Sequence, residues 1–171
     1  MITVVRAPIQ ELAVEAVVRP IRTDLGPVSS ASRDLWTAAG AGVHDHLDRL
    51  ESLPLGGAVM TPAGDLACDF LIHAVVMSED EPQTPATVQR ALRNSLGRAA
   101  DWGVESLALP PLGLGVGLAE PEESARALLE VLFEHVAAGA PPQDLRVVVT
   151  SAFESDIFER LITMGDTREQ T

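Results

Sequence analysis

The sequence predicts an α/β fold with three layers, in which a mixed, mostly parallel central sheet lies between helices. Three observations predict it. Short apolar runs typical of strands alternate along the chain with segments of helical periodicity. Residues 70–77 are apolar almost throughout, which suits a central strand covered on both faces. The chain has 171 residues, 46% of them hydrophobic, and this is enough for one domain with a substantial core.

Six short runs rich in apolar and β-branched residues are predicted to be strands. They span residues 2–6, 14–19, 58–60, 70–77, 105–109 and 145–150. In sheets of this kind, ligands bind beyond the carboxyl ends of the strands. The loops that follow these strands are therefore the expected place of a site.

Four segments are predicted to be helical. Residues 29 to about 50 have helical periodicity, with a break near Gly40 and Gly42. A second helix begins at Thr84-Pro85, a cap followed by proline at the first helical position, and ends at Trp102-Gly103. The third spans residues 121 to about 138 and the fourth 155–164. One domain is expected over residues 1–164, followed by a polar, frayed tail over 165–171.

Composition excludes several classes of partner. The net charge of −13 argues against broad binding to nucleic acid or anionic membranes, because both need a basic surface. No apolar run approaches the roughly 20 residues of a membrane span, and the N-terminus does not resemble a signal peptide. Cys68 is the only cysteine, which fits a cytoplasmic location. A small phosphorylated ligand remains compatible with the charge, because local donors decide its binding.

The most informative segment is the glycine-rich loop after the strand at 105–109. Gly113, Gly115 and Gly117 stand at alternate positions, and a helix that begins at Pro121 follows. Glycines let backbone N–H groups approach a ligand, and the helix N-terminus adds unpaired donors and positive potential. A strand, glycine loop and helix in this order can cradle a phosphate. The alternative is an ordinary connection in which glycine supplies turn angles.

Four stretches in this order resemble the macro domain family, a module known for binding ADP-ribose. Residues 2–18 resemble its first strands. Residues 54–61 and 70–76 resemble its middle strand pair, including the string Ile-His-Ala-Val at 72–75. Residues 93–99 resemble the helix before its phosphate loop, and residues 106–117 resemble that strand and loop. The resemblance covers about residues 2–162 and implies a three-layer α/β/α fold with a crevice for ADP-ribose or a similar phosphorylated small molecule.

The ligand loops depart from the family pattern. Pro8 stands where the family has an aspartate that accepts a hydrogen bond from the adenine amino group. The family's Val-Asn-Ala-Ala-Asn is Val-Arg-Pro-Ile-Arg at residues 18–22, and its Gly-Gly-Gly-Val loop is Pro-Val-Ser-Ser at 27–30. Gly113-Leu114 replaces the usual Ser-Thr before the retained glycine. These changes indicate an altered ligand, a lost ligand or a new use of the scaffold.

The resemblance and the loop positions together predict the ligand-binding residues. They are Ile9, Arg19, Arg22, Ser29, Ser30, Gly113, Leu114, Gly115, Val116, Gly117 and Phe153. Arg19, Arg22 and Arg33 flank the expected crevice and can hold an anion with paired hydrogen bonds. Alternatively, they pair with acidic residues on a solvated face. Phe153 is a ring that stacks on a base or packs in the core.

Few residues offer catalytic or metal chemistry. Only Asp24 and Asp34 are candidates for a general base, because the position of the acidic residue in hydrolytic members falls near Ser32. The residues at 44–48, His-Asp-His-Leu-Asp, are interpreted as a polar helix face, so no metal site is expected. His73 is interpreted as a core histidine satisfied by a hydrogen bond, and Cys68 as an inert thiol.

Three functions follow from these observations. The first is a module that binds ADP-ribose or a related nucleotide diphosphate, with weak or absent hydrolysis and no cofactor. The second is a hydrolase of ADP-ribose esters or conjugates, which needs a carboxylate that the aligned position lacks. The third is a scaffold that has lost nucleotide binding and acts through protein partners or as a homo-oligomer.

Overall fold

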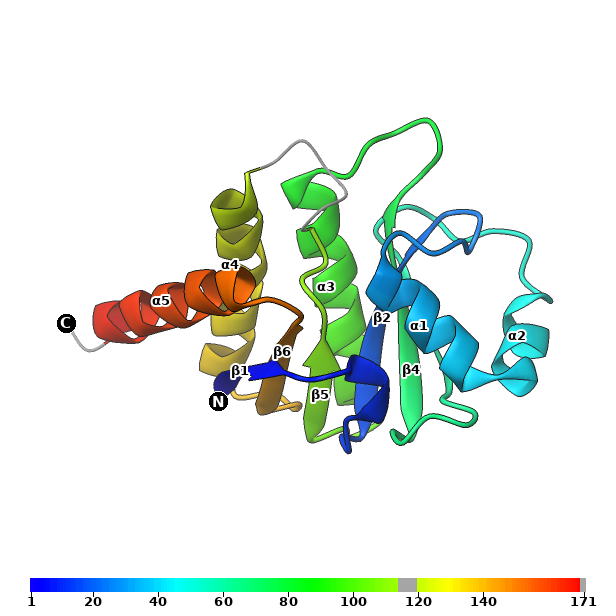
Figure 1. Ribbon diagram of the computed structural model, residues 1–171, viewed down its shortest axis with the longest axis horizontal. Helices are drawn as coiled ribbons and strands as arrows, with labels where there is room; N and C mark the ends of the chain where they lie inside the picture. Colours follow the sequence, from blue (N-terminus) through cyan, green and yellow to red (C-terminus); the bar gives the residue numbers. More distant parts are fainter. Residues whose placement is uncertain (114–119, 170–171) are drawn as a thin grey trace.

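Six strands form one twisted sheet in the order β1-β6-β5-β2-β4-β3 (Figure 1). The computed structural model describes the backbone of residues 1–113 and 120–169 and the side chains of residues 1–113 and 120–165. The strands are β1 (Ile2–Arg6), β2 (Ala16–Arg22), β3 (Ala58–Pro62), β4 (Phe70–Met77), β5 (Ser106–Leu109) and β6 (Asp144–Val149). The helices are the 3-10 turn η1 (Ile9–Glu11), α1 (Ser30–Ala39), α2 (Ala41–Leu47), α3 (Pro85–Asp101), α4 (Pro121–Ala138) and α5 (Ala152–Glu169).

The pairing confirms a mixed, mostly parallel sheet. Neighbouring strands from β1 to β4 are parallel, and only the edge strand β3 runs antiparallel, against β4. The carboxyl ends of five strands therefore lie at one edge of the sheet, where the loops that enter α1, α3, α4 and α5 also lie (Figure 1).

Helices cover both faces of the sheet, as the apolar strands require. One buried cluster joins the inward faces of α3, α4 and α5 to strand residues such as Val18, Ile72 and Leu107. A second cluster joins η1, α1 and α2 to the other face, through residues that include Val17 and Leu71. The alternation along β2, with Val17 on one side and Val18 on the other, shows why a central strand reads as an uninterrupted apolar run.

β2 extends beyond its predicted end at residue 19. β2 continues to Arg22 because its end pairs with β4, whereas β5 pairs with β2 only at Ala16 and Val17. Pro20 thus lies past the part of β2 that has two partners, where a proline is tolerated. The expected break in the first helical segment is confirmed at Gly40, between α1 and α2.

The last helix is longer than the predicted 155–164, because α5 continues through Glu169. The helix also begins before Ser155, the predicted first residue. A capping box explains this start: Ser151 Oγ accepts from Glu154 N (3.2 Å), and Glu154 Oε2 accepts from Ser151 N (3.2 Å).

Glu15 fastens the start of β2 to the start of β5. Its Oε2 accepts hydrogen bonds from the backbone N–H groups of Glu105 (2.7 Å) and Ser106 (2.9 Å). These two donors hold the pKa of the Glu15 carboxyl below its usual value. No helix in the described part of the chain is long and apolar enough to cross a membrane.

Candidate functional site

The candidate site lies at the edge of the sheet where the parallel strands end. The segments from β2 into α1 and from β6 into α5 meet this edge, as do the N-termini of α3 and α4 (Figure 1). Because β6, β5 and β2 are neighbours in the sheet, the described residues that directly follow these strands are neighbours too. This placement is the one that open parallel sheets use for ligands.

The loop after β2 is a tight turn that satisfies its own polar groups. Arg22 N donates to Gly26 O (2.9 Å), and Leu25, with a φ of 72°, closes the turn by donating to Arg22 O (2.9 Å). The Arg22 guanidinium grips Asp24 with two bonds of 3.0 Å, and Gly26 N donates to the same carboxylate (3.0 Å). Arg22 and Asp24 were predicted for separate roles, and the structure pairs them with each other.

This pairing weakens the case for Asp24 as a general base. The hydrogen bonds from Arg22, and then from Gly26, lower the pKa of the Asp24 carboxyl, and the pair raises the pKa of Arg22. A carboxylate with a lowered pKa accepts a proton poorly near neutral pH. Asp34, the other candidate, is exposed on α1, whereas Ser32 and Leu35 on the same helix are buried.

The N-terminus of α1 lies at this edge of the sheet. Ser29 is its N-cap, with Oγ accepting from Ser32 N (3.2 Å), and Ser30 follows as an exposed first helical residue. The Ser32 hydroxyl donates inward to Pro20 O (2.6 Å). Backbone N–H groups of this first turn and the Ser30 hydroxyl can therefore donate to an anion, while Ser32 is committed to the core.

Arg19 corrects the sequence prediction, because it lies in the core and not on the crevice surface. Its side chain is 0% exposed, on the face of the sheet that α1 covers. Its Nε donates to Ser32 O (3.0 Å), and its guanidinium lies over the Trp36 ring, 4.5 Å from the ring centre. The stack on Trp36 and the hydrogen bond to Ser32 O thus hold β2 against α1.

A row of hydrogen-bonded polar side chains continues from Arg19 onto β4 and β3. Arg19 Nη1 bonds to His73 Nδ1 (3.3 Å), and His73 Nε2 bonds to Thr61 Oγ1 (3.0 Å). A guanidinium only donates, so Nδ1 must accept and the imidazole proton must lie on Nε2. Burial, with the Arg19 charge second, lowers the pKa of His73 to about 3, so the ring is neutral. The prediction of a satisfied core histidine is confirmed.

The Arg19 charge is buried without a carboxylate partner among the described residues. Burial lowers its pKa to about 10, so that the group still carries a charge at neutral pH. Its Nη2 is buried and makes no hydrogen bond within the described part of the chain. The core below α1 therefore holds a positive charge that the net composition does not suggest.

Phe153 and Ile9, both predicted to contact a ligand, differ in their exposure to solvent. The Phe153 ring is 65% exposed at the start of α5, so plain core packing, one of its two expected roles, is wrong. Ile9 is only 5% exposed and belongs to the core cluster under α1, so its side chain is not available to a ligand. Of the two, Phe153 alone offers a face to a bound ring.

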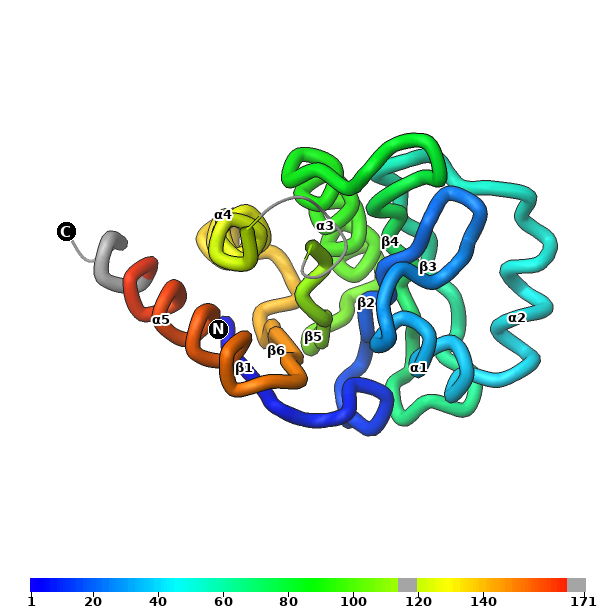
Figure 2. The backbone as a smooth tube through the Cα atoms, turned by 45° about the horizontal axis from the view of Figure 1, so that its top comes forward, coloured from blue at the N-terminus to red at the C-terminus, as the bar shows by residue number. Residues whose placement is uncertain are grey.

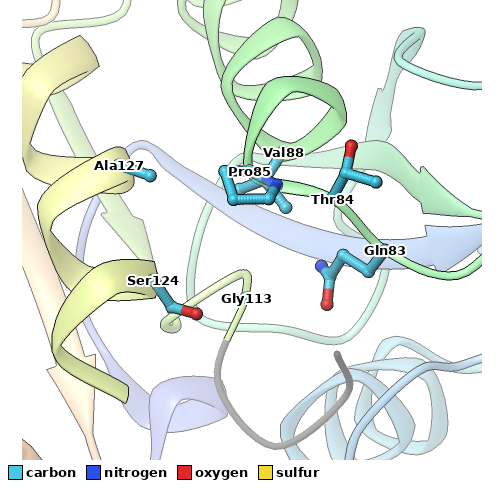
Figure 3. Close-up of a pocket in the computed structure, with 7 residues that line it drawn as sticks. All are labelled: Gln83, Thr84, Pro85, Val88, Gly113, Ser124 and Ala127. Atoms are coloured by element: carbon cyan, nitrogen blue, oxygen red, sulfur yellow. The ribbon is translucent and has the colours of Figure 1, made fainter. Parts of the chain in front are cut away.

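The start of the glycine loop lies beside a small cavity. Gly113, Gln83 and Ser124 line it, between the N-termini of α3 and α4 (Figure 3). Gln83 donates from Nε2 to Leu112 O, while its buried Oε1 has no partner among the described residues. The cavity of about 10 Å³ is near the lower limit for one water molecule, so it cannot hold a nucleotide. Leu114, Gly115, Val116 and Gly117 lie outside the described residues.

The remaining candidates carry no chemistry in the structure. Within the described residues, no cluster of three His, Cys, Asp or Glu side chains could hold a metal ion. His44 stacks on Trp36, with ring centres 3.9 Å apart, and bonds to the Trp36 carbonyl (2.8 Å). Cys68 is buried, and burial raises its pKa to about 11, which keeps the thiol protonated.

Comparison with known proteins decides the family. A sequence profile of the macro domain matches residues 26–128. The chain belongs to the macro domain family. The sequence is 34% identical to an uncharacterized protein of Aeropyrum pernix over 113 residues, which is 66% of this chain and 60% of that protein. It is 28% identical over 172 residues to an O-acetyl-ADP-ribose deacetylase of Escherichia coli strain K12, covering 96% of this chain and 97% of that protein.

Solved structures share the fold of this macro domain. The Oceanobacillus iheyensis macrodomain with ADP superposes with a TM-score of 0.84 at 19% identity, covering 96% of this chain and 91% of the other. The three-layer α/β/α prediction is thereby confirmed. The structure places Arg22 at the end of β2 and Ser29 and Ser30 at the start of α1, with Gly113 after β5 and Phe153 at the start of α5. Arg19 and Ile9 lie in the core.

The sequence analysis did not predict that the loop before α3 lies beside the start of the glycine loop. Gln83 and Ser124 approach the glycine loop from two helix N-termini, and neither was singled out. The cap at Thr84-Pro85 places Gln83 at the carboxyl edge of β4, and that signal could have found it.

Proposed function

We propose that this macro domain binds ADP-ribose or a related nucleoside diphosphate in the crevice beyond β2, β5 and β6, with weak or no hydrolysis. The observation that carries the proposal is the presentation of an exposed aromatic ring and an open helix N-terminus on neighbouring loops of one sheet edge. Phe153 offers its face to a base, and the first turn of α1 offers N–H groups to a phosphate. The relatives named for ADP and for O-acetyl-ADP-ribose support this choice of ligand.

The prediction of weak hydrolysis rests on the lack of an available base among the described crevice residues. Asp24 is held by Arg22 and Gly26, Asp34 is on an exposed face of α1, and the Ser32 hydroxyl is bonded to the Pro20 carbonyl. General base catalysis needs a titratable group within about 3 Å of the moving proton or one water away. The second candidate function is O-acetyl-ADP-ribose deacetylation, which the 28% identity over nearly the whole chain favours.

Calorimetric titration of the protein with ADP-ribose, with AMP and ADP as controls, tests binding. Micromolar affinity for ADP-ribose is expected, and no heat together with no thermal shift would remove the proposal in favour of a scaffold. Gly115→Trp should abolish binding if the glycine loop approaches the phosphates. Release of acetate from O-acetyl-ADP-ribose at a rate comparable to an active deacetylase would overturn the statement on hydrolysis.

A further inference from the structure

A long groove runs over the outer face of α4, from the N-termini of α3 and α4 toward the C-terminal half of α5. It encloses about 970 Å³, with α4 as its floor, the N-terminal half of α3 on one side and the C-terminal half of α5 on the other. Figures 1 and 2 show α4 between these two helices, with α5 projecting past the edge of the sheet. Phe133, Leu161 and Met164 give the groove an apolar interior, and the Met164 side chain is 44% exposed.

The rim of this α4 groove is acidic. Glu123, Glu130 and Glu134 line it along one side of α4, and Arg126 is the one lining guanidinium among the described residues. Arg126 is already paired with Glu122 (2.6 Å), and Glu134 is paired with Arg93 of α3 (2.9 Å). Glu123 and Glu130 have no cationic partner within the described part of the chain. Spacings of seven and four residues place the three carboxylates on one stripe of the helix. The groove thus combines an apolar floor with excess negative charge, in a protein whose net charge is −13.

We infer that the α4 groove is a docking site for a basic amphipathic helix of a partner protein. An apolar helix face laid into a groove, with basic residues against an acidic rim, is a recurring mode of recognition. The α4 residues that line the groove run from Glu123 to Ala137, about 21 Å at about 1.5 Å per residue, which is the length of about four turns of a partner helix. A second copy fits poorly, because a two-fold interface would set the same three glutamates on both sides.

A designed peptide tests this inference directly. The probe is a fluorescein-labelled 16-residue helix with leucines along one face and lysines on the other. One control peptide replaces each lysine with glutamate, and another scrambles the order so that no apolar face forms. Fluorescence polarisation should show saturable micromolar binding of the leucine–lysine peptide, weakened by salt, and no binding of either control.

Variants of the protein locate the binding. Met164→Glu and Glu130→Lys should each raise the dissociation constant about fivefold or more, because each removes one of the two complementary features. Glu51→Lys makes the same charge change at an exposed residue after α2, away from the groove. This variant should change the dissociation constant of the peptide less than twofold. Thermal stability and the affinity for ADP-ribose should be the same in all three variants and the parent.

Three results would overturn the inference. The first is no peptide binding at millimolar protein, and the second is equal weakening by Glu51→Lys and Glu130→Lys, which indicates unspecific charge attraction. The third is a dimer in sedimentation analysis that Met164→Glu dissociates, which would assign the groove to a second copy. Because ADP-ribose affinity is measured separately, failure here and failure of the proposed nucleotide function are distinguishable.

Discussion

Replacing Phe153 with alanine should weaken the binding of adenine nucleotides while leaving the fold intact. The ring is 65% exposed, so its removal creates little cavity, and the free energy of unfolding should change by no more than about 0.5 kcal/mol. Stacking of a base on an aromatic side chain contributes about 1–3 kcal/mol. Taking about 1.5 kcal/mol for an exposed ring, the dissociation constant of ADP-ribose should rise about tenfold.

Trp102→Ala is the matched control for this variant. Trp102 is 67% exposed, yet it follows the C-terminal end of α3, at the sheet edge opposite the crevice, where it contacts Phe70 at the start of β4. Calorimetry should show the same loss for AMP and ADP-ribose in Phe153→Ala, no loss for ribose 5-phosphate, and no loss of any ligand in Trp102→Ala. A change of less than twofold in Phe153→Ala, or an equal change in both variants, would refute base stacking at this position.

Three further predictions concern the residues that support the site. Glu15→Gln should lower the free energy of unfolding by about 1.5 kcal/mol at pH 7, since charged acceptors strengthen the bonds to the N–H groups of β5. Because the pKa of Glu15 is lowered in the folded state, the difference in unfolding free energy between the parent and Glu15→Gln is complete above about pH 4.3 and fades as the pH falls through the folded-state pKa. Urea denaturation at pH 7 and pH 3 measures this difference. A difference that grew in acid would contradict the assignment. Arg19→Lys should cost about 2 kcal/mol in urea denaturation, because an ammonium cannot keep both bonds and the stack on Trp36; an unchanged midpoint would show that the fork contributes nothing. Asp24→Asn should change stability by less than about 1 kcal/mol, as expected for an exposed pair, and should change any measured hydrolysis less than threefold, whereas loss of a general base would reduce it at least about 100-fold.

The fold was predictable because its signals are local and repeated. Residues 70–77 matched β4, and the Thr84-Pro85 cap and Gly139 fixed the ends of α3 and α4. The start of α5 was misplaced because its capping box lies in Ser151 and Glu154, before the apolar residues that suggest a helix. Periodicity reports the buried face of a helix, and capping reports its ends.

The site was less predictable because it depends on which side of a strand a residue faces. Arg19 looked like a ligand-binding residue, since arginine is rarely buried without a partner. Its alternation with Val18 assigns it to the face under α1, where it meets Ser32 and Trp36 of α1 and His73 of β4. No local pattern shows that these groups meet. The pairing of Arg22 with Asp24, two residues apart, was visible in the sequence and could have been weighed.

The two arginines of β2 bear on how the proposed site could bind an anion. The Arg22 guanidinium is hydrogen-bonded to Asp24 within the turn, so a diphosphate that bound to Arg22 would first have to break that pair. An exposed pair contributes only about 0–1 kcal/mol, a barrier that a charge-assisted phosphate contact would exceed. Arg19 cannot be recruited, because it is fully buried, but it holds the carbonyl of Ser32 and thereby the first turn of α1 in place. We therefore expect an anion at this edge of the sheet to meet the N–H groups of α1 first, and the Arg22 guanidinium only once its pair with Asp24 has broken.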